Sequence, residues 1–141
     1  MSNRSDKYTI ETKKVVQYTD FLTNLDKNPL TGFLAKVKNE DAVKQSVRNL
    51  ILTERTERFM QPQIGSKIHT LLFEPLDQHS ADLLRTTIRE TINTNEPRAV
   101  LNDVTVEPRE DLNVYFVSVY FGIRNVPEES FNLSLILRRV R

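Results

Sequence analysis

The chain has no cysteine and no tryptophan, and only three of its 141 residues are glycine. Without cysteine there is no disulfide, no thiolate nucleophile and no cysteine-containing zinc site. The glycines, Gly32, Gly65 and Gly122, lie far apart, which excludes a glycine-rich phosphate loop. The two histidines, His69 and His79, have no carboxylate at the spacing of a metal site. We therefore expect neither a cofactor nor a metal ion.

The chain also lacks an excess of charge of one sign and lacks long apolar runs. Lysine and arginine number 20 and aspartate and glutamate 19, a net charge of +1, which is too little to predict a nucleic-acid or anionic membrane partner. No apolar run approaches the roughly 20 residues that span a bilayer, and the first seven residues contain no signal-peptide core. We expect synthesis in a cytoplasm, no membrane contact and one hydrophobic core.

The N-terminal third of the sequence has weak periodicity. We assign residues 1–22 to a polar arm that ends in a short strand near 16–21, and residues 23–141 to a single domain. The loop-forming composition of residues 23–29 separates this strand from a second extended segment at 33–37.

Three helices are predicted after this segment. Asn39 is placed to cap the first, which carries a core stripe of Val43, Val47, Leu50 and Ile51. A turn follows in which Gly65 takes positive φ and Ser66 caps a short second helix that ends at Glu74-Pro75. Ser80 or Asp77 opens the third helix, with Leu84, Ile88 and Ile92 at four-residue spacing and Asn93 to Asn95 at its end.

Three strands complete the predicted fold. They cover residues 98–107, 112–124 and 131–138, with turns at 108–111 and 125–130. The middle strand is apolar on both faces, which is typical of a strand that is central in its sheet or covered by a partner. The predicted class is α+β: an extended N-terminal arm, about three helices, then a three-stranded antiparallel meander.

Two groups of polar residues are candidates for function. The triplet Glu96-Pro97-Arg98 forms a rigid corner between helix and strand, and it either ties the helix down through an ion pair or presents charges to a partner. The carboxylates of Glu54, Glu57, Glu74 and Glu96 could include an acid/base pair of a glycosidase, but salt bridges to Arg55, Arg58 and Arg98 are the favoured use for them.

An ordered set of short motifs gives the sequence a family resemblance. Its members are Ala42, Gln45, Ser46, Leu52, Thr53, Glu57, Arg58, Pro62, Gly65, Ser66, Leu72, Phe73, Glu74, Pro75, Glu96, Pro97 and Arg98. In this order they resemble the small baseplate wedge subunit of contractile-tailed bacteriophages, the sheath-initiator family, which has a counterpart in type VI secretion baseplates. The motifs are most similar to those of family members from large myophages. Two positions depart from the family pattern, Thr56 where glycine is usual and Ile64 where phenylalanine is frequent.

The resemblance implies a structural protein of the tail baseplate rather than an enzyme. It implies partners among baseplate wedge proteins and the tail sheath protein, multiple copies in a ring-shaped assembly, and a place in the virion after assembly in the host bacterial cytoplasm. It marks Glu96, Pro97 and Arg98 as the partner contact. It marks Val114, Phe116, Leu133, Leu135 and Leu137 as the strands that template the sheath, and Glu57, Arg58, Pro62, Gly65 and Phe73 as turn motifs. The alternative is a peptidoglycan-degrading, lysozyme-like tail enzyme.

Overall fold

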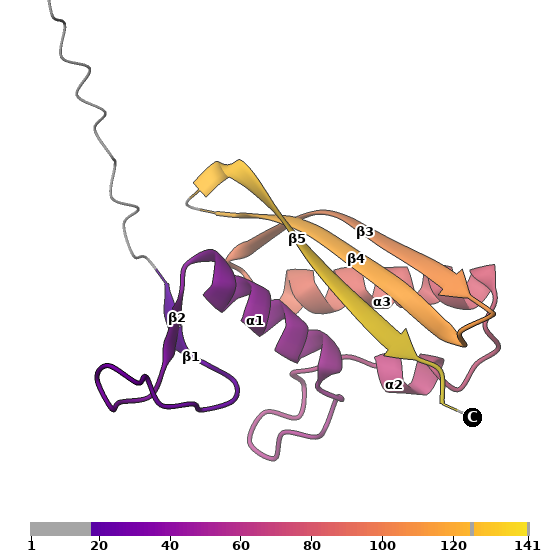
Figure 1. Cartoon of the computed structure of the whole chain (residues 1–141). Helices are drawn as coiled ribbons and strands as arrows, with labels where there is room; N and C mark the ends of the chain where they lie inside the picture. Colours follow the sequence, from indigo (N-terminus) through magenta and orange to yellow (C-terminus); the bar gives the residue numbers. More distant parts are fainter. Residues whose placement is uncertain (1–17, 125, 141) are drawn as a thin grey trace, which may run out of the picture.

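A computed structural model of the chain describes residues 18–124 and 126–140, and within them it shows an α+β fold (Figure 1). The elements are β1 (Thr19–Phe21), β2 (Lys36–Lys38), α1 (Glu40–Leu52), α2 (Ile68–Leu71), α3 (Gln78–Asn95), β3 (Ala99–Arg109), β4 (Val114–Ile123) and β5 (Val126–Arg138). The predicted class and order of elements are confirmed: helices come first, and an antiparallel sheet in the order β3-β4-β5 follows. None of the helices in the described residues is long and apolar enough to cross a membrane.

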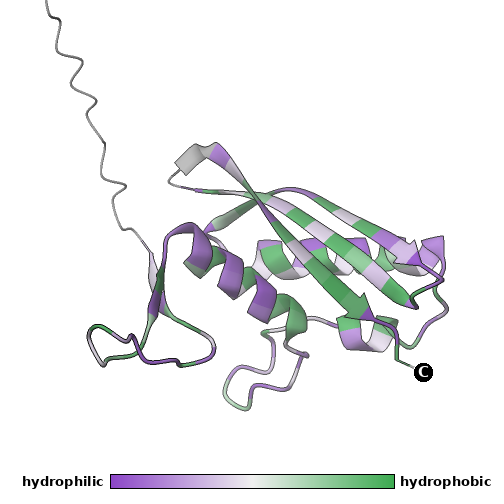
Figure 2. Ribbon diagram, viewed as in Figure 1, coloured by the Kyte–Doolittle hydropathy of each residue, from purple (hydrophilic) through white to green (hydrophobic). Residues whose placement is uncertain are grey.

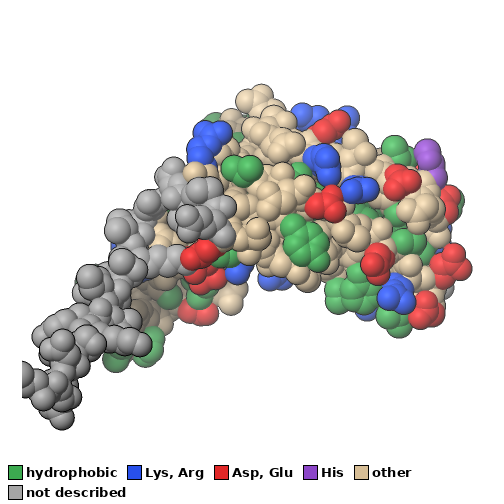
Figure 3. All heavy atoms as spheres, turned by 90° about the horizontal axis from the view of Figure 1, so that it is seen from above, with side chains coloured by type: hydrophobic (Ala, Val, Ile, Leu, Met, Phe, Trp, Pro, Cys, Tyr) green, Lys and Arg blue, Asp and Glu red, His purple; other side chains and the backbone are tan. Residues whose placement is uncertain are grey.

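The helices cover one face of the three-stranded sheet and leave the other face open (Figure 1). On the covered face, β4 contributes Tyr115, Val117, Val119, Phe121 and Ile123, and none of these side chains is more than 2% exposed. The open face is mixed: Tyr120 is 41% and Ile136 65% exposed, and hydrophobic and charged side chains lie side by side there (Figure 3). The prediction that β4 is central is therefore confirmed.

The apolar stripes of α1 and α3 form the other half of the core (Figure 2). The stripe of α1 is buried as predicted, and Leu84, Ile88 and Ile92 of α3 are all fully buried. Asp77 caps α3, because its carboxylate accepts a hydrogen bond from the Ser80 backbone N–H at 2.7 Å. The sequence patterns therefore predicted both buried helix faces correctly.

Three local predictions are corrected by the structure. Asn39 precedes α1 at a φ of 48° and makes no side-chain cap, because its side-chain oxygen lies toward the Tyr18 N–H instead, at 3.4 Å. The strand β3 continues through Pro108, so the turn to β4 follows Arg109. The strand β5 already begins at Val126, with a shift in register beside Ile123. Proline is tolerated late in β3 because an edge strand can leave one side of its backbone unpaired.

The N-terminal elements form a small hairpin apart from the main sheet, with β1 antiparallel to β2. The strand predicted near 16–21 is present at its C-terminal end, and the second extended segment is displaced to Lys36–Lys38. Residues 1–17 lie outside the described residues, so the division into an arm of residues 1–22 and a domain of residues 23–141 stays a prediction.

The two ends of the connection between α1 and α2 lie side by side and form backbone hydrogen bonds with each other. The Ser66 N–H donates to the Thr53 carbonyl at 2.8 Å, and the Arg55 N–H donates to the Ser66 carbonyl at 3.0 Å. Gly65 has a φ of 124°, and a Cβ there would lie 2.8 Å from the carbonyl oxygens of Thr53 and Glu54. Only glycine fits this close approach, as predicted for the turn. The prediction that Ser66 caps the second helix is wrong, because α2 begins after Lys67 and has no side-chain cap. The Ser66 hydroxyl donates to the Ile51 carbonyl at 2.8 Å instead, and the N–H of Ile68 lies 3.4 Å from that hydroxyl.

The same connection contains a residue with a strained backbone, and a substitution by glycine can remove the strain. Thr56 has a φ of 78°, a left-handed conformation that is unfavourable for a β-branched side chain. We expect Thr56→Gly to raise the free energy of unfolding by about 0.5–1 kcal/mol, since the removed strain exceeds the added entropy of the unfolded chain. Urea denaturation measures this change. Thr86→Gly, on the exposed side of α3, is the matched control and should lower stability by about 0.5 kcal/mol; a loss of stability in both variants would contradict the interpretation.

Candidate functional site

The corner between α3 and β3 is built around an ion pair whose carboxylate is buried and whose guanidinium is partly exposed. Glu96 is 3% exposed, and its two carboxylate oxygens accept hydrogen bonds from Nε and Nη2 of Arg98, each at 2.6 Å. The Ser46 hydroxyl, on α1, donates to the same carboxylate. Pro97 holds the two charged residues in a fixed relation, because its ring fixes φ. One carboxylate therefore joins α1, the end of α3 and the start of β3.

The electrostatics of this carboxylate favour its charged form. Burial raises the pKa of Glu96, but the hydrogen bonds from Arg98 and Ser46 and the positive charge of Arg98 outweigh burial, so the pKa lies below its ordinary value. The pKa of Arg98 is raised, chiefly by its hydrogen bonds to Glu96. Both groups are therefore charged at neutral pH.

The corner opens onto a groove of about 440 Å³. Its walls come from β1, α1, the connection after α1 and the corner itself, and they include Asp20, Asn49, Arg58, Ile64 and Pro97. The Arg98 side chain is 32% exposed and lies 5.6 Å from the centre of the Tyr18 ring. Of the two uses expected for the triplet, the ion pair is present, and Glu96 does not present its charge outward because the hydrogen bonds from α1 and Arg98 turn it inward. Pro97 and part of Arg98 remain accessible.

The residues predicted to template the sheath lie at different depths of the main sheet. Val114, Leu135 and Leu137 are buried, Leu133 is partly buried, and Phe116 lies on the open face between Glu107 and Ile136. Their role as templating residues stays a prediction. The buried members hold β4 and β5 in place, so any contact with an incoming strand depends on the backbone at the edge of β5.

The hydrogen-bond phase of β5 identifies which backbone groups reach that edge. The Arg139 N–H donates to the Asn113 carbonyl at 3.2 Å, and the register runs without a shift from Ser130 to Arg138. Because alternate residues of an antiparallel ladder bond to the neighbouring strand, the odd-numbered residues face β4. Asn132, Ser134 and Ile136 therefore direct their N–H and C=O groups to the open edge. Sequence reasoning missed these three residues, although their alternation with leucines was the available signal.

The family turn residues lie mostly in the connection after α1. Glu57 and Arg58 are exposed, and a carboxylate oxygen of Glu57 accepts a hydrogen bond from the Glu54 N–H at 2.9 Å. Pro62 accepts the Thr56 N–H through its carbonyl at 2.9 Å, and Gly65 closes the connection. Phe73 follows α2 and is 61% exposed. The structure thus places four of the five family turn residues in the connection after α1, whereas Phe73 lies outside it, after α2.

Of the carboxylates considered for hydrolysis, three are exposed, and the buried one, Glu96, does not have the electrostatics of a catalytic acid. Glu54 and Glu57 are exposed in one loop and Glu74 is exposed after α2. The one buried carboxylate, Glu96, has a lowered pKa, whereas a general acid needs a raised one. Within residues 18–124 and 126–140, no group of three or more acidic and histidine side chains could hold a metal ion.

Comparison with known proteins places this fold and corner in a class of structural proteins of contractile tails. The family described as "Baseplate wedge protein gp25" matches residues 37–128, which include the helices, the corner and the central strand. The chain belongs to this family. The baseplate wedge protein gp25 of Enterobacteria phage T4 is 26% identical over 96 residues, 68% of this chain and 73% of the phage protein.

Solved structures share this fold. A Geobacter sulfurreducens protein, given the provisional name tail lysozyme, is 27% identical with a TM-score of 0.67, over 72% of this chain and 92% of that one. A chain in the baseplate of the anti-feeding prophage is 23% identical with a TM-score of 0.60, over 88% and 87% of the two chains. A chain of a type VI secretion baseplate complex is 18% identical with a TM-score of 0.54, over 68% and 91%. The last two show a shared fold.

The buried ion pair predicts a defined pH dependence of stability. Since the pKa of Glu96 is lower in the folded chain than the ordinary value of 4.5, its contribution is complete above that value and is lost as the pH falls through the folded pKa. Glu96→Gln should lower the free energy of unfolding at pH 7 by about 1–3 kcal/mol and flatten its acid dependence. Urea denaturation at a series of pH values from 7 down into the acid range measures the free energy of unfolding and its pH dependence. Glu107→Gln, on the exposed β3 edge, is the control, and an unchanged acid slope in Glu96→Gln would contradict the assignment.

Proposed function

We propose that this protein is a non-enzymatic component of a contractile-tail baseplate wedge that joins wedge proteins to the first sheath ring and initiates sheath assembly. Family membership supports the structural baseplate role. The observation that carries the finer proposal is the open edge of β5, which can accept a strand from the tail sheath protein. The protein acts in multiple copies in a ring-shaped assembly, and it is built in the host bacterial cytoplasm and carried in the virion.

The two edges of the main sheet differ in a way that favours β5. At β3, Pro108 lacks an N–H, the register shifts between Leu101 and Asp103, and Asp103 is held by Arg85 and Arg89 at 2.8 and 3.2 Å. Proline, irregular register and charge are the features by which edge strands avoid pairing. The edge of β5 from Ser130 to Arg138 has no proline and regular register. Strand addition is therefore favoured at β5.

A groove beside β5 supplies a place for the side chains of an added strand. This groove of about 450 Å³ lies between α1, β5 and the loop that follows β1. Its lining includes Leu22, Lys44, Arg48, Leu52 and Leu133. Leu52 is 44% exposed. A strand that pairs with β5 would extend the sheet over this groove, and apolar side chains on its helix-facing side would cover Leu52 and Leu133.

The surface proposed for wedge proteins is the corner groove with the two loops near it. The β1–β2 loop and the connection after α1 both extend on the side away from the sheet (Figure 1). Leu30 and Phe33 in the first, and Phe59 and Met60 in the second, are 93%, 77%, 92% and 87% exposed. Exposed apolar groups in such numbers are typical of protein interfaces. Pro97 and Arg98 are the accessible members of the proposed contact, while Glu96 supports them from inside.

The sheath proposal predicts a separation of folding from assembly in β5. Ser134→Pro removes an N–H that faces the open edge, and the exposed side chain leaves the core intact, so stability should change by no more than about 1 kcal/mol. Baseplates that contain this variant should not nucleate sheath, as electron microscopy of assembling particles can record. The matched controls are Ser134→Ala, which keeps the N–H, and Leu135→Pro, which should unfold the domain because that N–H faces β4. Normal sheath on Ser134→Pro baseplates would falsify strand addition at this edge.

The wedge proposal predicts a charge-sensitive contact at the corner groove. Arg58 is exposed and lines the groove, and it has no ion-pair partner among residues 18–124 and 126–140. Arg58→Glu should therefore leave the fold intact and reduce recovery of wedge proteins in a pull-down from assembling particles. Arg98→Glu is a poorer probe, because a second carboxylate beside Glu96 would destabilise the corner. Arg109→Glu, at the far end of β3, is the control. Equal recovery with both variants would exclude this groove as the contact.

A further inference from the structure

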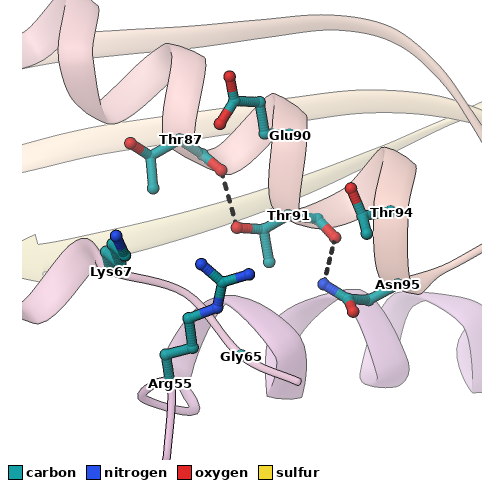
Figure 4. Close-up of a pocket in the computed structure, with 8 residues that line it drawn as sticks. All are labelled: Arg55, Gly65, Lys67, Thr87, Glu90, Thr91, Thr94 and Asn95. Atoms are coloured by element: carbon teal, nitrogen blue, oxygen red, sulfur yellow. Dashed lines mark hydrogen bonds between the residues drawn. The ribbon is translucent and has the colours of Figure 1, made fainter. Parts of the chain in front are cut away.

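A second polar pocket lies on the other side of the connection after α1, facing α3 (Figure 4). It has a volume of about 180 Å³ and is lined by Arg55, Gly65, Lys67, Thr87, Glu90, Thr91, Thr94 and Asn95. This set shares no residue with the groove beside β5, and only Asn95 with the corner groove. Neither the family's turn motifs nor the proposed sheath and wedge contacts account for its two cationic side chains.

The backbone of the connection brings these cations together. Glu54 and Ser66 form a parallel bridge, so the residues that follow them, Arg55 and Lys67, lie next to each other although they are twelve positions apart in sequence. The close packing of Gly65 against the Thr53 and Glu54 carbonyls fixes this arrangement. Both side chains are exposed and line one small pocket, where two positive charges favour an anion placed between them.

The facing wall on α3 offers little compensation for these charges. The Thr91 hydroxyl donates to the Thr87 carbonyl at 2.8 Å, and the Asn95 amide donates to the Thr91 carbonyl at 2.9 Å. These donors are therefore turned into the helix itself, as the dashed lines in Figure 4 show. Arg55 and Lys67 form no ion pair within the described part of the chain. Glu90 is the one acidic residue in the lining, so two cations against one carboxylate leave one positive charge uncompensated.

We propose that this pocket is a binding site for a carboxylate from a partner protein chain, an aspartate or glutamate side chain or a chain terminus. A single negative charge matches the excess charge of the lining, and the planar guanidinium of Arg55 suits the two oxygens of a carboxylate. A phosphate carries more negative charge and would be repelled by Glu90. The small volume fits a side-chain end rather than a larger ligand. This contact deepens the proposed baseplate function, on which it rests, by adding an ionic contact on the α3 side.

Zero-length crosslinking of assembled baseplates tests the proposal directly. A carbodiimide joins a lysine amine to a carboxylate only where the two are in contact, so mass spectrometry should find Lys67 coupled to an acidic residue or C-terminus of another chain. Arg55→Gln should reduce the yield of this product about tenfold, because it removes a charge-assisted pair. The matched control Arg109→Gln loses the same charge elsewhere and should leave the yield unchanged.

A titration of the free protein distinguishes the ligand classes. Sodium acetate added at constant ionic strength should shift the NMR signals of the Arg55 Nε–H and the Gly65 amide in the wild type and not in Arg55→Gln. Inorganic phosphate that binds more tightly than acetate would overturn the carboxylate assignment. The assignment would also be overturned if, in particles that contain the protein, Lys67 were coupled only to Glu90 of its own chain and to no residue of another chain. Because that last result requires normal incorporation, it contradicts the pocket while the baseplate function stands.

Discussion

The buried carboxylate of Glu96 is the interaction on which the arrangement of the molecule depends. It lies at the end of α3, accepts one hydrogen bond from Ser46 of α1, and holds Arg98 at the start of β3. A charge this deeply buried is stable only with its partners in place. The hydrogen bond from Ser46 therefore anchors α1 at the wall of the corner groove, beside the buried apolar stripe that packs this helix into the core. The triplet at this corner is a structural joint, and its accessible members, Pro97 and Arg98, are the residues proposed to contact a partner.

The surfaces proposed for assembly share a common plan. Each places accessible groups on a rigid backbone: the edge of β5 rests on buried leucines, Pro97 and Arg98 rest on Glu96, and Arg55 and Lys67 rest on the tight turn at Gly65. Rigid presentation reduces the conformational entropy that is lost when an interface forms. This plan suits a structural protein of an assembly, because its contact surfaces already have their final shape when other chains bind.

The sequence could not reveal which backbone groups and charges come together across long separations. The leucines of β5 were recognised from their alternation, but the free edge is formed by Asn132, Ser134 and Ile136, whose role depends on the strand order and on the phase of the ladder with β4. The ion pair of Glu96 with Arg98 was one of the two uses expected for the triplet, but the hydrogen bond from Ser46 was not predicted, because Ser46 lies fifty residues earlier. Arg55 and Lys67 read as ordinary surface charges until the bridge between Glu54 and Ser66 placed them side by side.

The sequence by itself determined the class of fold, the buried faces of α1 and α3, the central position of β4, and the need for glycine at position 65. These features are local or periodic, since they depend on side-chain spacing and on the conformations that each residue allows. Only the tertiary structure decided the inward turn of Glu96, the open edge of β5 and the pairing of Arg55 with Lys67. Those features depend on contacts between distant segments, which form when the helices pack onto the sheet and which no short window of sequence records.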